Sequence, residues 1–142
     1  MKVLSTGAKY RVPSGTYFSK GHTWIRKNIY GLIKIGVDDF IVKSLDEARV
    51  ISVLGTGSNI KKGDPIFELS GNAGRLILYS PINCKIAFNN PGIIGKINED
   101  PYEDDWITLA LCPDFINIKD GLLSSEEYTK WIEQEVHHVV KQ

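Results

Sequence analysis

Short apolar runs separated by turn residues fill the chain from about residue 17 to residue 112. The runs are rich in Ile, Val, Phe, Tyr and Trp, and Gly, Asn, Asp or Pro lies between them. This pattern is typical of β-strands joined by tight turns. We therefore predict strands at 23–26, 30–35, 49–54, 65–69, 76–79, 85–88 and 106–111. Short strands at such close spacing favour an antiparallel barrel or sandwich over β-α-β units.

Two helices interrupt or follow this strand pattern. The first is predicted at 38–45, where apolar residues have helical spacing. The second begins at Ser124, because Ser124 and Glu127 have the spacing of a capping box. Apolar residues then recur every three or four positions, at Tyr128, Trp131, Ile132, Val136, Val139 and Val140. We expect this amphipathic helix to dock on the β core, with binding to a partner protein as the alternative.

A chain of 142 residues suits one domain with short appendages. We divide it into an N-terminal arm at 1–16, a β domain at 17–112 and a C-terminal helical segment at 113–142 that packs on the β domain. The arm has a weak pattern, which fits either a loose segment or an extra edge strand.

Charge and composition narrow the classes of function. Lys and Arg together number 17, as do Asp and Glu, so the chain lacks the basic excess typical of nucleic-acid binders. No apolar run is long enough for a transmembrane helix, and the first residues do not resemble a secretory signal. The only cysteines, Cys84 and Cys112, are widely spaced and are expected to be buried, reduced thiols. We therefore expect a cytoplasmic protein.

Candidate catalytic or metal-binding groups are few. The three histidines are His22, His137 and His138, and their spacing does not form a metal-ligand motif. His22 is expected to pack or to form a hydrogen bond beside Trp24. Five carboxylates gather between residues 99 and 105, at Glu99, Asp100, Glu103, Asp104 and Asp105. We interpret them as a solvated loop, because acid–base catalysis needs a pocket that separates the pKa values of two carboxyl groups. No metal and no catalytic residue are predicted.

Several segments, taken in order, resemble the glycine cleavage system H protein family. His22 is followed two positions later by Trp24, and a glycine-containing turn at 35–40 leads into the first predicted helix. Further similar segments lie at 62–64, at 79–81, at 98–102 with Trp106, and at 122–128. The resemblance spans about residues 17 to 135. It implies a mainly β lipoyl/biotinyl-type barrel-sandwich hybrid with a C-terminal α-helix.

The resemblance also implies a task. Proteins of this family carry lipoate on a lysine at an exposed hairpin tip, within a Glu-Ser-Val-Lys-Ala type of sequence, and present it to the enzymes of glycine cleavage. The cofactor supplies the chemistry, and the protein supplies the platform. The loop at 89–95 is shorter and more apolar than the acidic loop usual in the family.

This chain departs from the family at the attachment site. The register from both sides places Ala73 where the lysine is expected, with Ser70, Gly71, Asn72 and Gly74 completing the hairpin. No lysine occurs from Gly63 to Cys84, and the guanidinium of Arg75 is not an acyl acceptor. We therefore expect no cofactor.

The function that follows from this reading is a non-lipoylated protein-binding or scaffold module. Its expected partners are proteins, including glycine-cleavage-type or lipoate-related enzymes, and neither nucleic acid nor membrane is expected. One alternative is a lipoate-bearing aminomethyl carrier of glycine cleavage, modified at another lysine. A second alternative is an enzyme with a small-molecule site in the loops.

Overall fold

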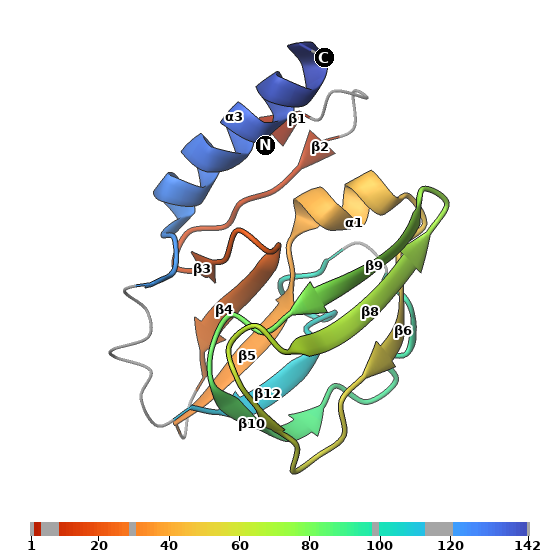
Figure 1. Cartoon of the computed structure of the whole chain (residues 1–142), viewed down its shortest axis with the longest axis vertical. Coiled ribbons are helices and arrows are strands. Elements are labelled where there is room, and N and C mark those ends of the chain that lie inside the picture. Colours follow the sequence, from red (N-terminus) through yellow and green to blue (C-terminus); the bar gives the residue numbers. More distant parts are fainter. Residues whose placement is uncertain (1, 4–8, 29–30, 98–99, 113–120, 142) are drawn as a thin grey trace.

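The computed structural model describes residues 2–3, 9–28, 31–97, 100–112 and 121–141. The elements are β1 (Lys2–Val3), β2 (Lys9–Tyr10), β3 (Tyr17–Phe18), β4 (Thr23–Lys27), β5 (Leu32–Val37), α1 (Asp39–Leu45), β6 (Arg49–Val53), β7 (Asn59–Ile60), β8 (Pro65–Gly71), β9 (Gly74–Tyr79), β10 (Cys84–Asn89), β11 (Gly95–Lys96), β12 (Thr108–Leu111) and α3 (Ser125–Lys141). They form a six-stranded sheet in the order β3-β4-β5-β12-β10-β7, a four-stranded sheet in the order β11-β6-β8-β9, and the pair β1-β2 (Figure 1). All strand pairs between these named strands are antiparallel.

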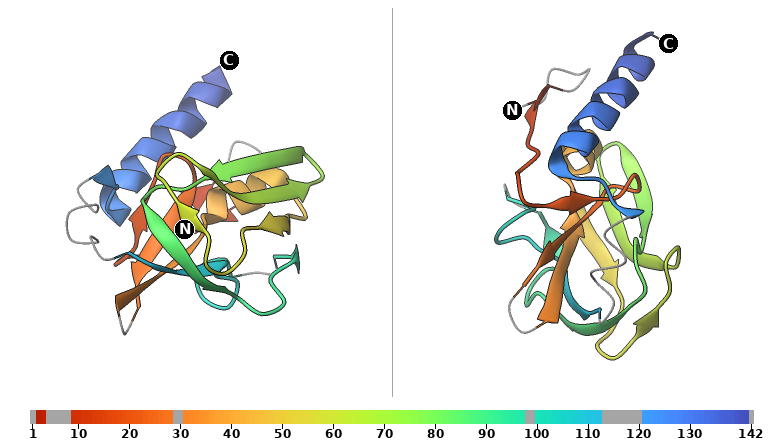
Figure 2. Two further views of the ribbon diagram at one scale, coloured as in Figure 1. Left: turned by 60° about the horizontal axis from the view of Figure 1, so that its bottom comes forward. Right: turned by 90° about the vertical axis from the view of Figure 1, so that its left-hand side faces the viewer.

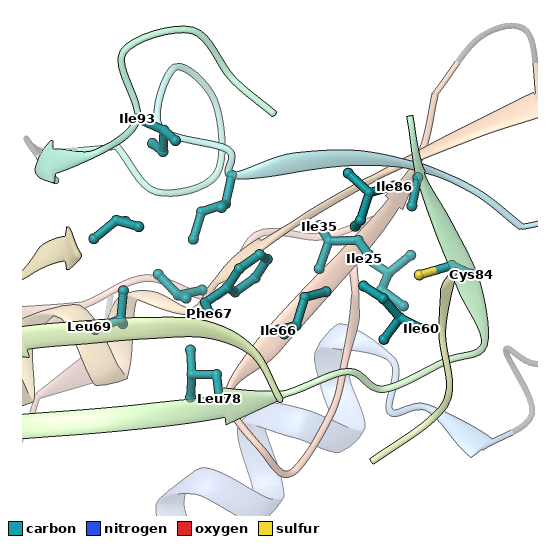
Figure 3. Packing of buried hydrophobic residues seen from close by; sticks show 14 of the residues in the cluster. Ile25, Ile35, Ile60, Ile66, Phe67, Leu69, Leu78, Cys84, Ile86 and Ile93 are labelled. Atoms are coloured by element: carbon teal, nitrogen blue, oxygen red, sulfur yellow. The ribbon is translucent and has the colours of Figure 1, made fainter. Parts of the chain in front are cut away.

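The main hydrophobic core lies between the two larger sheets (Figure 3). Ile25 and Ile35 point into it from β4 and β5, and Phe67, Leu69 and Leu78 meet them from β8 and β9. Alternate residues of a strand face the same side of a sheet, so that apolar side chains of both sheets can be buried together between them. Not every strand has one buried and one exposed side, because Thr23, Trp24 and Ile25 of β4 are all buried.

The predicted strands agree with the observed ones, with differences at their ends. β8 and β9 each extend two residues further toward their shared turn than predicted, because pairing continues to Gly71 and Gly74. Glycine has a low strand propensity, so the sequence pattern stops short of the turn. The strands β3, β7 and β11 have two residues each, which is too short for an alternating pattern to reveal.

The C-terminal helix α3 begins as predicted and docks on the β core. The backbone N–H of Glu127 donates to Ser124 Oγ at 3.2 Å, and the N–H of Ser124 donates to Glu127 Oε1 at 3.0 Å. Tyr128 and Ile132 are fully buried in a second cluster, together with Tyr10, Phe18, Trp24 and Tyr102. Figure 2 shows α3 lying beside β3 and the N-terminal strands. No helix among the described residues is long and apolar enough to cross a membrane.

The capping box predicts a pH dependence of stability. Hydrogen bonds to the Glu127 carboxylate from the backbone N–H of Ser124 and from the Ser124 side chain lower the pKa of Glu127 from 4.5. A lowered folded-state pKa means that the contribution is complete above pH 4.5 and is lost as the pH falls through the lowered value. We expect Glu127→Gln to make the urea midpoint less sensitive to acidification, and Glu126→Gln, in the same turn, to change it less. An equal effect of both variants would assign the dependence to the helix dipole instead.

Candidate functional site

The tip of the β8–β9 hairpin carries the residues that the sequence singles out. Gly71 and Gly74 pair across the hairpin, and Asn72 and Ala73 form the exposed two-residue turn between them. Gly74 has a φ of 138°, a backbone conformation that favours glycine. Ala73 thus lies at the apex of a hairpin.

The hairpin tip is bound to the end of α1. The backbone N–H of Ala73 donates to Leu45 O at 2.9 Å, and that of Asn72 donates to Asp46 O at 2.7 Å. The Asn72 side-chain amide also donates to Asp46 Oδ2 at 3.0 Å. The last carbonyl groups of a helix have no hydrogen-bond partner within the helix. The backbone N–H groups of the hairpin tip serve as their donors at the end of α1. Sequence reasoning missed this contact, since nothing local links Asp46 to Asn72.

Two residues after α1 adopt a backbone that favours this contact. Asp46 and Glu47 have φ values of 57° and 55°, in the left-handed region that non-glycine residues seldom adopt. The close approach of the hairpin tip to α1 also requires glycine at position 71, because a Cβ there would lie 2.4 Å from Leu45 O and 2.6 Å from Asp46 O. Any side chain at position 71 would force the tip away from α1.

The hairpin itself supplies no primary amine, because no lysine occurs from Gly63 to Cys84. Arg75 is exposed and forms an ion pair with Glu68 on the neighbouring strand. The lysines nearest in the sequence on the β8 side are Lys61 and Lys62, which lie at the far end of that seven-residue strand, about 20 Å from the tip. Their backbone N–H groups are bound there by Asp64 and Asn83. The tip therefore does not fit a group that is held through an amide to a lysine.

His22 packs against aromatic side chains and forms a hydrogen bond, and the structure identifies its partners. Its Nδ1 lies 2.9 Å from Asp38 Oδ2, and its ring stacks on Phe40 and lies near Trp131 rather than beside Trp24. The Tyr128 hydroxyl donates to the same carboxylate oxygen. Burial and the nearby negative charge of Asp38 raise the pKa of Tyr128, so the phenol remains a donor. These contacts hold α1 and α3 together.

The remaining candidates are structural. Among the described residues no group of three His, Cys, Asp or Glu side chains could hold a metal ion, and the side chains of His137 and His138 lie outside that part. Of the acidic residues expected in a solvated loop, Glu103 and Asp104 are exposed, and Glu99 lies outside the described residues. Asp100 accepts the backbone N–H groups of Tyr102 and Glu103, both at 3.2 Å, in a turn whose Pro101 and Tyr102 are buried.

Neither cysteine forms a disulfide bond, and both are buried. Burial raises the pKa of the Cys84 thiol to about 11, so that Cys84 is protonated near neutral pH.

A shallow groove lies at the opposite end of the hairpin from Ala73. Its volume is about 430 Å³, and it is lined by Phe18, Ser19, Lys20, Lys62, Pro81, Gly121, Leu122 and Leu123. The lining contains no carboxylate, imidazole or thiol, so it offers no acid–base pair for catalysis.

Comparison with known proteins gives a consistent result. The family model described as "Glycine cleavage H-protein" matches residues 16–135. The chain is 33% identical over 128 residues to the glycine cleavage system H protein of Carboxydothermus hydrogenoformans, covering 87% of this chain and 96% of the relative. It is 29% identical over 125 residues to that of Coprothermobacter proteolyticus, covering 86% and 98%. The crystal structure of an H protein from Mycobacterium marinum superimposes with a TM-score of 0.69 at 18% identity, covering 86% of this chain and 99% of that one.

Proposed function

This chain belongs to the glycine cleavage H-protein family, and we propose that it is a member that binds partner proteins without carrying lipoate. Proteins of this family are carriers that interact with the other proteins of glycine cleavage, and they are not enzymes. The family normally carries lipoate. In this role the protein has the fold of the family, carries no lipoate and acts in the cytoplasm.

The observation that carries the proposal is the side chain at the hairpin apex. Lipoylation forms an amide between a carboxyl group and a lysine Nζ, and the methyl group of Ala73 has no nitrogen to acylate. Arg75, two residues away, is a guanidinium that stays protonated and is already paired with Glu68. An amide-linked cofactor therefore has no attachment point at the tip.

A second observation supports the same proposal. The family-type sequence has Ser and Val where this chain has Gly71 and Asn72. Gly71 permits the close contact with Leu45 O and Asp46 O, and the Asn72 amide adds a side-chain bond to Asp46. Asn72 and Ala73 are exposed, but their hydrogen bonds to Leu45 and Asp46 fix the position of the tip on α1. The replaced residues suit a fixed surface.

The test is the intact mass after co-expression with a lipoate–protein ligase in medium containing lipoate. We expect no lipoyl group on the natural chain. We expect full modification of the variant that restores the family-type tip, Ser70→Glu/Gly71→Ser/Asn72→Val/Ala73→Lys. Ala73→Lys alone should be modified less, because Gly71 and Asn72 still hold the tip on α1. Arg75→Lys is the matched control, since it adds an amine two residues from the apex and should remain unmodified.

Each outcome decides between the two candidate roles. A lipoyl group on the natural chain would establish the carrier role at another lysine and overturn the proposal. If the variant with the family-type tip folds but is never modified, the fold of this protein no longer presents a lipoylation site to the ligase. That result would contradict the proposal that the protein retains the binding surface of the family.

A further inference from the structure

At one end of the outer face of the six-stranded sheet, two large apolar side chains, Phe88 and Leu111, are exposed. Residues opposite each other in antiparallel strands point to the same side, so the register identifies the side chains of this face. Lys34 lies opposite Leu109, Leu32 opposite Leu111, Lys85 opposite Leu111, and Phe88 opposite Leu109. We call these six residues the open sheet face: Leu32, Lys34, Lys85, Phe88, Leu109 and Leu111. None of them belongs to the core cluster between the sheets.

The other end of the same face is covered. Trp24 is on this side, opposite Gly36, and its ring would lie 2.6 Å from a Cβ at position 36. Tyr102 packs on Trp24, and α3 closes this end through Tyr128 and Ile132. In Figure 1, α3 lies at the opposite end of the molecule from β10 and β12. Among the described residues, the end of this face at Trp24 is therefore covered, while Phe88 and Leu111 at the other end are exposed.

The open sheet face is apolar and positively charged. Phe88 and Leu111 are 44% and 46% exposed, although both are large apolar side chains on regular strands. Trp106 borders the face: its ring is 6.0 Å from that of Phe88, and the Lys34 ammonium lies 5.6 Å from its centroid. Neither Lys34 nor Lys85 has a carboxylate partner within the part of the chain that the structure describes. The face thus combines four apolar side chains with two positive charges.

We propose that the open sheet face is the docking site of an acidic amphipathic helix of a partner protein. This inference rests on the proposed role as a protein-binding module and names the surface that performs it. An amphipathic helix buries its apolar stripe against the face of a sheet, and here α3 already covers the other end of the same face in this way. Leucines of the partner would contact Phe88 and Leu111, and its carboxylates would pair with Lys34 and Lys85.

The charge and shape of the face distinguish this occupant from others. A second copy of the chain would place the two lysines of each protomer against those of the other, and like charges at an interface oppose association. An anionic membrane would attract the lysines, but the apolar residues lie on the strands of a sheet, and Leu109 is only 6% exposed, so the face offers little to insert among lipid headgroups. An acidic helix satisfies both the apolar and the positive groups.

The test uses the full chain and a synthetic peptide of about 18 residues with leucines on one helical face and glutamates on the other. Amide chemical shifts locate the binding site, and calorimetric titration gives the affinity. We expect the largest shifts at Phe88, Leu109 and Leu111, and a dissociation constant that rises with salt. Leu111→Glu and Lys34→Glu/Lys85→Glu should each weaken binding about tenfold or more. Ile77→Glu is the matched control: Ile77 is 45% exposed on the other sheet and should bind like the natural chain.

Several results would overturn the inference. These are the absence of binding, shifts confined to other surfaces, and equal binding of a peptide in which lysines replace the glutamates. Binding to phosphatidylserine vesicles in place of the peptide would assign the face to a membrane, and sedimentation as a dimer that Leu111→Glu dissociates would assign it to a second copy. The lipoylation test concerns Ala73 on the other sheet, so failure of the peptide experiment leaves the proposed lack of lipoate intact, and the reverse also holds.

Discussion

Asp38→Ala is expected to lower the free energy of unfolding by about 3–5 kcal/mol, because it removes a fully buried carboxylate that three groups share. Asp38 Oδ1 accepts the backbone N–H of Ile41 at 2.8 Å and so caps α1. Asp38 Oδ2 accepts the Tyr128 hydroxyl and lies 2.9 Å from His22 Nδ1. Without the carboxylate, the tyrosine hydroxyl loses its buried partner and α1 loses its cap.

The measurement is chemical denaturation with urea, followed by circular dichroism. Asp64→Ala is the matched control: Asp64 is exposed and accepts one turn hydrogen bond, from the Lys61 N–H, so its loss should cost about 1 kcal/mol. Tyr128→Phe removes one of the three contacts and should fall between the two. A loss at Asp38→Ala no larger than at Asp64→Ala would show that the three contacts do not stabilise the packing of α1 and α3.

Gly36→Ala is expected to destabilise the protein by about 2–3 kcal/mol through overpacking. A Cβ at this position would lie 2.6 to 2.7 Å from three atoms of the Trp24 ring. Trp24 cannot easily move aside, because it is fully buried and its Nε1 donates to Pro101 O at 3.1 Å. The cost falls on the packed end of the six-stranded sheet, where Trp24, Tyr102 and α3 meet.

Gly55→Ala is the control for this substitution. No atom lies within 4 Å of a Cβ built there, and Gly55 does not have a positive φ. We expect its stability to change by no more than about 0.5 kcal/mol. Denaturation midpoints and the tryptophan emission maximum measure both variants. If Gly36→Ala unfolds at the same urea concentration as Gly55→Ala, the close contact between Trp24 and Gly36 does not constrain the fold.

The short helix α1 connects the C-terminal helix α3 to the tip of the β8–β9 hairpin. Its N-terminal residue Asp39 follows Asp38, which holds α3, and its C-terminal residue Leu45 accepts the N–H of Ala73 at the hairpin tip. A helix of seven residues therefore joins the docked C-terminal helix to the hairpin apex at Ala73. The hairpin tip is positioned by the same element that anchors α3.

Several local features of this protein follow from the sequence alone. The capping box of α3 depends on two residues three positions apart, Ser124 and Glu127, so the sequence alone predicts it. The apolar runs of β4, β5 and β8 likewise predict these strands, although not which of their side chains enter the core. The absence of an amine at Ala73 is also a fact of sequence, because no change of packing can create one.

Only the tertiary structure decided how distant residues meet. The Asp38–Tyr128 contact joins residues 90 positions apart, and the Asn72–Asp46 contact joins residues 26 apart. The open sheet face is a third case, since it exists only because β5, β12 and β10 pair in one particular register. Hydrophobic periodicity shows that a strand has a buried and an exposed side, but it does not show which strand lies next to it or what covers its outer face. Those choices follow from the packing of the whole chain, so they become visible only in three dimensions.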